Sequence, residues 1–362
     1  SKLKKNNIDF YTGVPDSILK NLSSVLENLK FNQHIIASNE GSACSIGIGY
    51  YLKNKKLPCI YLQNSGLSNA MNPLISIANK DVYEIPLLLI IGWRGSPKQK
   101  DEPQHKVKGK ITRRLLNLMK INHCILRKKK DLQKVEKLIK TAKKNNTVVA
   151  CLIEQNILNI KSQKSLFKKF SNQKSYVLRS NFIESLLEQI PKSSKIISTT
   201  GYTSRELMHL RLKKKLKKGS DFYMVGGMGH SLSTAIGYSI KSKANVFCLD
   251  GDGSVLMHLG SLRTSGYLNI KNLKHIILNN GCHESVGGQK TYAEDINFKK
   301  LSESIGFKKY FIIENERDMK KKINSFIKYQ GQSIMEVKIK SKSLKNLPRP
   351  NDLIKIKKRF MA

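Results

Sequence analysis

An acidic, glycine-rich turn between two apolar segments limits the possible folds of this chain more than any other feature. The turn is the sequence DGDGS at 250–254, and the apolar run at 244–249 before it predicts a buried strand. A second apolar run ends just before Asn280, which stands 28 positions after Asp252. Between the two runs, residues 254–267 space their apolar side chains as a helix does. These patterns predict two parallel strands joined by a helix.

The predicted unit brings a carboxylate and an amide to one edge of a sheet. Carboxyl ends of neighbouring parallel strands meet there, and ligands of open α/β folds bind at that edge. Oxygen groups such as those of Asp252 and Asn280 suit Mg²⁺, which takes few protein ligands and keeps several waters. Gly251 and Gly253 leave room for a group to approach the backbone. The plainer alternative is a strand turn with a solvated Asp252 and Ser254 capping the helix.

Both halves of the 362-residue chain alternate strand and helix patterns. This alternation predicts an α/β fold with two domains, each a parallel sheet flanked by helices. We expect the first domain at 1–160, a linker rich in Lys, Ser, Gln and Asn at 161–178, and the second domain at 179–362. The predicted strands are 8–11, 31–37, 58–62, 86–92, 147–153, 196–198, 222–225, 244–249, 275–278, 310–313 and 333–339. The predicted helices are 17–29, 40–52, 66–77, 132–143, 181–189, 204–210, 230–240, 254–267 and 319–329.

The charge of the chain is extreme, with a formal net value of +40. A basic surface can bind nucleic acid, but no helix-turn-helix, zinc-knuckle spacing or aromatic–basic interleaving accompanies it. We therefore expect a Lys-rich surface that attracts small anions, and no specific nucleic-acid partner. A polyanion-binding protein that kept the fold without the chemistry is the alternative from another class.

The cysteines and the apolar segments indicate the cellular compartment in which the protein is expected. The six cysteines form no C-x-x-C pair and several lie in apolar runs, which is typical of reduced thiols in a cytosolic protein. No apolar run reaches the roughly 18 residues of a membrane span, and the first residues lack the apolar core of a signal peptide. These patterns predict a cytoplasmic protein without a membrane partner.

The Gly-Asp-Gly turn followed by Asn279-Asn280 resembles the diphosphate and magnesium motif of thiamine-diphosphate enzymes. The resemblance implies that thiamine diphosphate and Mg²⁺ are the cofactors. It places the metal on the Asp252 carboxylate, the Asn280 side chain and the main-chain carbonyl of Cys282. Further segments, in this order, resemble phosphonopyruvate decarboxylases: 11–17 (YTGVPDS), 92–95 (GWRG), 101–105 (DEPQH) and 279–289 (NNGCHESVGGQ).

Glu40 is the candidate carboxyl for the other end of the cofactor. It follows a predicted strand and opens a helix of small residues, where a dry site would favour the protonated acid. A glutamate in the first turn of a helix is also favoured by the helix dipole alone. By resemblance, Glu40 hydrogen-bonds the pyrimidine ring nitrogen and activates the cofactor.

The resemblance extends to the segments that would hold the rest of the cofactor. Met228 stands where the family places an apolar wedge, and the Gly226 carbonyl would accept from the cofactor amino group. Hydroxyls and amides of 199–203 would bind diphosphate oxygens. The expected cofactor-binding residues are Thr200, Gly201, Tyr202, Gly226, Met228, Gly251, Asp252, Gly253, Ser254 and Asn280.

The implied reaction converts 3-phosphonopyruvate to phosphonoacetaldehyde and CO₂. Asp16 and His105 are the expected proton carriers, although Asp16 could be a helix N-cap and His105 a surface loop residue. Arg94 suits phosphonate oxygens through its two-pronged guanidinium, unless it pairs with Asp101 or Glu102 instead. The remaining expected substrate-binding residues are Gln104, His283 and Ser285.

The family resemblance also bears on assembly and on related reactions. It places the cofactor between subunits, so we expect a homodimer or homotetramer. It also implies a role in phosphonate biosynthesis. The alternatives are sulfopyruvate decarboxylase, which is often split over two chains, and a carboligase that uses a second keto acid. Fusion of the two halves favours the phosphono enzyme.

Overall fold

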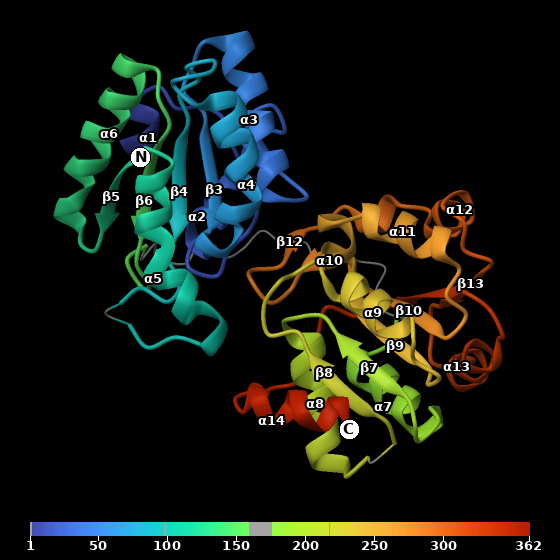
Figure 1. Cartoon of the computed structure of the whole chain (residues 1–362). Helices are drawn as coiled ribbons and strands as arrows, with labels where there is room; N and C mark the ends of the chain where they lie inside the picture. The colour runs from blue at the N-terminus through green and yellow to red at the C-terminus, as the bar shows by residue number, and fades with distance from the viewer. Residues whose placement is uncertain (1, 98, 159–175, 217) are drawn as a thin grey trace. The chain divides into compact units, whose positions relative to one another are not determined.

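The computed structural model describes residues 2–97, 99–158, 176–216 and 218–362. They fall into two compact units, shown in Figure 1: residues up to 158 with Val286–Gln289, and residues 176–285 with Lys290–Ala362. Most of the predicted linker lies outside the described residues, so its boundaries stay a prediction. Residues 176–178 belong to the second unit, where Val177 forms a parallel bridge with Ile339.

The first unit is built on a six-stranded parallel sheet in the order β2-β1-β3-β4-β6-β5. Its central strands are buried on both faces, as continuous apolar runs in a parallel sheet require. The edge strand β5 is not among the predicted strands, because only its last residue is fully buried and its apolar pattern is weak. The strands are β1 (Tyr11–Gly13), β2 (His34–Ile36), β3 (Cys59–Gln63), β4 (Leu88–Gly92), β5 (Asn122–Leu126) and β6 (Val149–Ile153).

Helices cover the two faces of this sheet and complete two apolar cores. Helix α3 begins at Glu40, as predicted, because the Asn39 side chain accepts from the Ser42 N–H at 2.9 Å and caps the first turn. The helices are α1 (Lys2–Lys5), α2 (Lys20–Leu26), α3 (Glu40–Asn54), α4 (Leu67–Pro73), a π-helical turn (Leu74–Ala78), α5 (Pro103–Leu118) and α6 (Leu132–Asn145).

Helix α5 is absent from the sequence-based prediction, although it carries two of the expected site residues. The helix is strongly basic and buries only Gly109, Thr112 and Leu116, so its apolar periodicity is faint. It packs by close backbone approach: a Cβ at Gly109 would lie 1.6 Å from the Gly95 carbonyl oxygen. The Gly109 carbonyl also accepts from the Trp93 indole at 2.9 Å.

The second unit contains a six-stranded parallel sheet in the order β13-β14-β10-β9-β7-β8. The predicted α/β fold, with two parallel sheets flanked by helices, is therefore confirmed. The strands of this sheet are β7 (Lys195–Ser198), β8 (Ser220–Tyr223), β9 (Val246–Gly251), β10 (Leu273–Asn279), β13 (Lys309–Ile313) and β14 (Ser333–Lys338), and a separate ribbon joins β11 (Cys282–His283) to β12 (Gln289–Lys290). The helices are α7 (Arg179–Gln189), α8 (Tyr202–Lys214), α9 (Ser231–Ser239), α10 (Asp252–Met257), α11 (Gly260–Leu268), α12 (Phe298–Ser304), α13 (Met319–Lys328) and α14 (Leu353–Met361).

The single helix predicted at 254–267 is wrong, because the segment forms two helices. Helix α10 starts at Asp252 and ends at Met257, and His258 leaves helical geometry with φ −135° and ψ 57°. The His258 ring stacks on His230 with ring centroids 4.4 Å apart, and a Cβ at Gly229 would lie 2.3 Å from it. Apolar spacing continued across this break and gave no signal of it.

Two helices of the second unit are absent from the sequence-based prediction. They are α12 and the C-terminal α14, whose Phe360 packs on Phe222 and Tyr238.

Within the described ranges, no helix combines the length and the apolar character needed to cross a membrane.

The close approach at Gly109 predicts that Gly109→Ala destabilises the first unit. Overpacking against the Gly95 carbonyl should cost about 1–3 kcal/mol, more than alanine gains in helix propensity. Gly49→Ala in α3 is the matched control, because a Cβ there meets nothing within 4 Å. Denaturant unfolding followed by the fluorescence of Trp93, the single tryptophan, measures both variants. Equal stability of the two would contradict the packing argument.

Candidate active site

Asp252 is a buried carboxylate at the carboxyl end of β9. Its side chain is 3% exposed and accepts a hydrogen bond from the Thr291 hydroxyl. Burial raises the pKa of Asp252 to about 6, against the lowering effect of the hydrogen bonds from Thr291 and the main-chain N–H of Gly253. Among the described residues, no Lys or Arg forms an ion pair with Asp252. A divalent cation would supply the missing positive charge.

Asn280 follows β10, the strand paired with β9, and Leu278 and Gly251 are register partners at that edge. The Asn280 amide donates to Glu284 Oε2 at 3.2 Å, and its oxygen accepts from the Cys282 N–H at 3.2 Å. The Cys282 carbonyl accepts from the Glu284 N–H at 3.0 Å. Gly281, with φ +69°, lets the chain turn sharply here. The three expected metal ligands thus follow adjacent strand ends.

Ser254 joins three strand ends through one hydroxyl. Its Oγ accepts from the Thr199 hydroxyl at 3.0 Å and from the Gly229 N–H at 3.0 Å. Thr199 follows β7 and Gly229 lies in the turn after β8, while Ser254 lies in α10 after β9. These contacts replace the helix-capping role considered for Ser254, and they hold the glycine-rich turns together.

The other expected cofactor-binding residues line these same turns. Gly201 has φ +85° and precedes α8, and the Thr200 hydroxyl donates to the Val225 carbonyl at 3.4 Å. A Cβ at Gly251 would meet nothing within 4 Å, so open space lies beside that turn. Tyr202 opens α8, and Gly226 and Met228 are half-buried in the turn after β8.

His283 and Ser285, expected to bind substrate, lie beside two of these turns. A Cβ at Gly253 would lie 2.6 Å from His283 Cε1, so the glycine makes room for the imidazole. Burial lowers the pKa of His283 to about 4, which leaves a neutral ring at pH 7. Ser285 is exposed, with its Oγ 3.4 Å from where a Cβ of Gly201 would stand.

Glu40 is buried in the first unit, with 5% of the residue exposed. The Asn69 side chain donates to its Oε2 at 2.9 Å, and no described hydrogen bond uses Oε1. A Cβ at Gly66 would lie 2.0 Å from Oε1, so only glycine leaves room for the carboxyl. Asn69 therefore holds Oε2 of Glu40 by a hydrogen bond, and Oε1 can bind a different partner.

Asp16 is a second buried carboxylate of this unit, with 1% exposure. Its Oδ2 accepts from the Ile18 and Leu19 N–H groups at 3.0 and 3.2 Å, and its Oδ1 has no hydrogen-bond donor among the described residues. Burial raises the pKa of Asp16 to about 6, against the opposing effects of the Leu19 N–H and Arg94. The capping alternative is thus half right: Asp16 caps the turn that leads into α2.

Arg94 forms ion pairs with Asp101 and Glu102, which the sequence analysis considered as the alternative to substrate binding. Its guanidinium binds Asp101 at 2.8 and 2.5 Å, Glu102 at 3.2 Å and the Ser17 hydroxyl at 3.0 Å. Gln104 donates to Glu102 at 2.6 Å. As it stands, the Arg94 charge is neutralised by two carboxylates.

His105 is half-buried near the start of α5 rather than in a surface loop. Burial lowers the pKa of His105 to about 4, and the Arg94 charge lowers it further while Asp101 opposes. One ligand atom from each of Asp101, Glu102 and His105 lies within 4.8 Å of the others. His105 therefore belongs to the polar cluster around Arg94.

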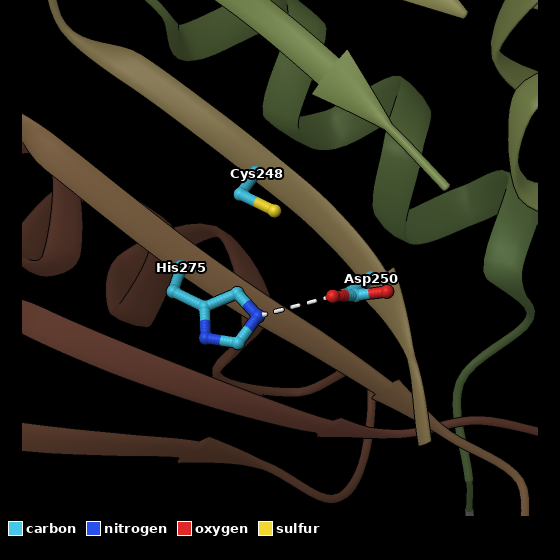
Figure 2. Close-up of side chains that lie close together, drawn as sticks. All are labelled: Cys248, Asp250 and His275. Carbon is cyan, nitrogen blue, oxygen red and sulfur yellow. Dashed lines mark ion pairs between the residues drawn. The ribbon is translucent and has the colours of Figure 1, made fainter. Parts of the chain in front are cut away.

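A second group of possible metal ligands lies beneath the Gly-Asp-Gly turn. Figure 2 shows the His275 ring pointing toward Asp250, with the Cys248 sulfur nearby. His275 Nε2 is 3.6 Å from Asp250 Oδ2, and Cys248 and His275 are register partners on β9 and β10. Asp250 Oδ1 also accepts from the Gly251 N–H at 3.1 Å, so this buried group fixes the start of the turn.

Comparison with known sequences decides the family. Residues 1–114 match "Thiamine pyrophosphate enzyme, N-terminal TPP binding domain" and residues 199–337 match "Thiamine pyrophosphate enzyme, C-terminal TPP binding domain". A phosphonopyruvate decarboxylase of Streptomyces viridochromogenes is 30% identical over 93% of this chain and 86% of its own length. One of Streptomyces hygroscopicus is also 30% identical over the same shares.

This chain belongs to the thiamine pyrophosphate enzymes. It is a thiamine-diphosphate-dependent decarboxylase, a carboxy-lyase related to the phosphonopyruvate and sulfopyruvate decarboxylases.

Fusion of the two halves in one chain does not favour the phosphonopyruvate decarboxylases over the sulfopyruvate decarboxylases. A sulfopyruvate decarboxylase of Methanosarcina acetivorans is 27% identical over 80% of this chain and 77% of its own length. A match of that extent includes parts of both halves, so a single chain does not separate this thiamine pyrophosphate enzyme from sulfopyruvate decarboxylases.

Sequence reasoning missed several residues that hold the site. Asn69 on Glu40 and Thr291 on Asp252 are distant in sequence from their partners, and no local pattern marks them. Arg179 and Glu284 form a buried ion pair 105 positions apart.

The buried Asp16 predicts a pH-dependent gain in stability for Asp16→Asn. Its pKa is raised from 3.8 to about 6, so ionisation penalises the folded state as pH rises through that window. At pH 8 the variant should be more stable by up to about 3 kcal/mol, and below pH 3.8 the gap should close. Unfolding followed by Trp93 fluorescence measures this, with the exposed Asp81→Asn as control. A gap independent of pH would refute it.

Proposed function

We propose that this enzyme decarboxylates 3-phosphonopyruvate to phosphonoacetaldehyde and CO₂, with thiamine diphosphate and Mg²⁺, in phosphonate biosynthesis. The observation that carries the proposal is the 30% identity to two phosphonopyruvate decarboxylases over 93% of the chain. The identity is lower and the match shorter for the single-chain sulfopyruvate decarboxylase.

The residues of the second unit suit the metal and the diphosphate. Asp252 is a buried carboxylate that pairs with no Lys or Arg in the part of the chain that the structure describes, and Asn280 and the Cys282 carbonyl supply neutral oxygens at the neighbouring strand end. Hard oxygen ligands of this kind match Mg²⁺. Gly251, which leaves space beside its turn, is where we place the diphosphate. When bound, thiamine diphosphate supplies the electron sink that decarboxylation of a 2-keto acid requires.

Glu40 is proposed to hold a proton on Oε1 and share it with the pyrimidine ring nitrogen. Asn69 satisfies Oε2, and Gly66 leaves space on the side of Oε1. We assign Glu40 to a pyrimidine-binding domain at 1–160 and Asp252 to a diphosphate-binding domain at 179–362. In the arrangement we propose, the two domains act on one cofactor from different subunits of a homodimer or homotetramer.

Asp16 and His105 are the proposed proton carriers. The Asp16 carboxyl has a pKa raised to about 6 and an Oδ1 without a donor, so it can take and return a proton near neutral pH. His105 has a pKa lowered to about 4, so it is a neutral imidazole at pH 7. A neutral ring can donate from one nitrogen and accept at the other.

Arg94, Gln104, His283 and Ser285 are proposed to bind the phosphonate and carboxylate of the substrate. For Arg94 this requires exchange: the anion has to replace Asp101 or Glu102 on the guanidinium. The net charge of +40 favours capture of a polyanionic keto acid from the cytoplasm. Sulfopyruvate, with a sulfonate in place of the phosphonate, is the second candidate substrate because of the single-chain relative.

The first test is CO₂ release from 3-phosphonopyruvate and from sulfopyruvate, each with and without both cofactors. We expect cofactor-dependent turnover that prefers the phosphonate. Preference for the sulfonate would replace the substrate while keeping the chemistry, and an acyloin product would indicate a carboligase. Absence of turnover with both would refute the proposal.

Glu40→Gln should fold and bind the cofactor but lose turnover by a factor of about 10²–10⁴, because an amide cannot share its proton in the same way. Steady-state CO₂ release and cofactor titration measure the two properties separately. The exposed Glu84→Gln is the control. Unchanged turnover would remove Glu40 from the mechanism.

Asp252→Ala should lose Mg²⁺-dependent binding of thiamine diphosphate, because it removes the charged ligand at the strand end. Isothermal titration with and without Mg²⁺ measures this, and the exposed Asp295→Ala serves as the matched control. Retention of metal-dependent binding would place the metal elsewhere.

A further inference from the structure

A buried arginine joins two separate parts of the second unit. Arg179 is the first residue of α7, and its side chain is 5% exposed. Its Nη1 donates to Glu206 Oε1 at 3.2 Å, and its Nη2 donates to Glu284 Oε2. One guanidinium thus bridges a carboxylate of α8 and a carboxylate of the loop after β11.

Each of the two carboxylates is tied to a further element. Glu206 is fully buried in α8, the helix that follows the Thr200–Tyr202 turn, and its Oε1 also accepts from the Leu344 N–H at 3.1 Å. Glu284 Oε2 also accepts from the Asn280 side-chain amide at 3.2 Å. The chain of contacts therefore runs from α8 through Arg179 and Glu284 to Asn280.

Glu284 and the Cys282 N–H together set which way the Asn280 amide faces. A carboxylate accepts hydrogen bonds only, so it holds the NH₂ side of the amide toward itself. The opposite orientation would set the amide oxygen against the carboxylate, two acceptors facing each other. The Asn280 oxygen is consequently directed away from Glu284, where it accepts from the Cys282 N–H at 3.2 Å. An amide oxygen has two lone pairs, so it can accept that bond and also ligate a metal.

Arg179 makes this arrangement of charges possible. Without its guanidinium, Glu206 and Glu284 would be two partly or fully buried carboxylates without their shared cation. Burying such charges unpaired is strongly unfavourable, so Glu284 would turn toward solvent, where its side chain is already 16% exposed. The Asn280 amide would then lose one of the two groups that orient it, and only the Cys282 N–H would remain.

We propose that Arg179 and Glu284 are positioning residues that orient the Asn280 oxygen toward the metal and so set the affinity for Mg²⁺. This rests on the magnesium site of the proposed function. Groups one step removed from a metal commonly change its affinity by about 10–100-fold when they are replaced.

The experiment measures Mn²⁺ binding, by the electron paramagnetic resonance signal of free Mn²⁺, to the full chain with thiamine diphosphate present. Arg179→Met and Glu284→Ala should each weaken Mn²⁺ binding by about 10–100-fold. Glu284→Gln should restore most of the affinity, because its amide oxygen still accepts from Asn280.

The Arg211–Asp221 pair provides a matched control. It is also an arginine–carboxylate pair of this unit, with a partly buried Arg211, a buried Asp221 and contacts of 2.8 and 2.7 Å, and it joins α8 to β8 without reaching Asn280. Arg211→Met should lower the melting temperature but leave Mn²⁺ affinity unchanged. A merely structural role for Arg179 would make the two arginine variants behave alike.

The outcomes separate this inference from the function it rests on. If the unaltered enzyme does not bind Mn²⁺, the magnesium site itself fails, and this inference fails with it. If the unaltered enzyme binds Mn²⁺ and Glu284→Ala binds it equally well, the inference is overturned while the site stands. The Glu284 variants decide the question even if Arg179→Met does not fold.

Discussion

Burying a carboxylate without a cation beside it is energetically unfavourable, yet both units of this protein contain such carboxylates near the ends of their strands. Asp16, Glu40 and Asp252 are 1%, 5% and 3% exposed, and none forms an ion pair with Lys or Arg among the described residues. The chain carries 66 Lys and Arg residues, so cations are abundant. Hydroxyl, amide and main-chain N–H donors stabilise these acids instead, and they leave the acids able to bind a metal or exchange a proton.

Arginines also pair with carboxylates in the same structure, but with different ones. Arg179 pairs with Glu206 and Glu284, and Arg211 pairs with Asp221. These pairs hold side chains of the second unit in fixed positions, and one of them contacts Asn280 through Glu284. The acids without such pairs are the ones proposed to contact substrate, cofactor or metal directly.

The sequence predicted the parts of the fold that repeat a local pattern. The strands on either side of the Gly-Asp-Gly turn and the start of α3 at Glu40 follow from apolar runs and capping residues. Helix α5 could not be predicted in this way, because a close contact between Gly109 and Gly95 holds it in place rather than an apolar stripe. The break at His258 depends on a ring stacked on His230, which no spacing of apolar residues records.

The site was predictable to a similar extent. The types and order of residues at the strand ends indicated the family, which the related decarboxylases confirm. The partners of those residues were not predictable, because Asn69, Thr291 and Arg179 reach them across long stretches of chain. The internal pairing of Arg94 was foreseen as an alternative, and only the structure shows that it forms.

The hydrogen bonds of Ser254 have a consequence for the order of folding. Its partners Thr199 and Gly229 stand 55 and 25 positions earlier in the chain, and Thr291, the partner of Asp252, stands 39 positions later. Contacts of such long sequence separation form late, because the loops between them must close first. During synthesis, a chain that has not yet extended past residue 291 therefore lacks the Thr291 hydroxyl that holds Asp252 at the proposed metal site. Cofactor capture thus belongs to the last stage of folding, when the second unit is nearly complete.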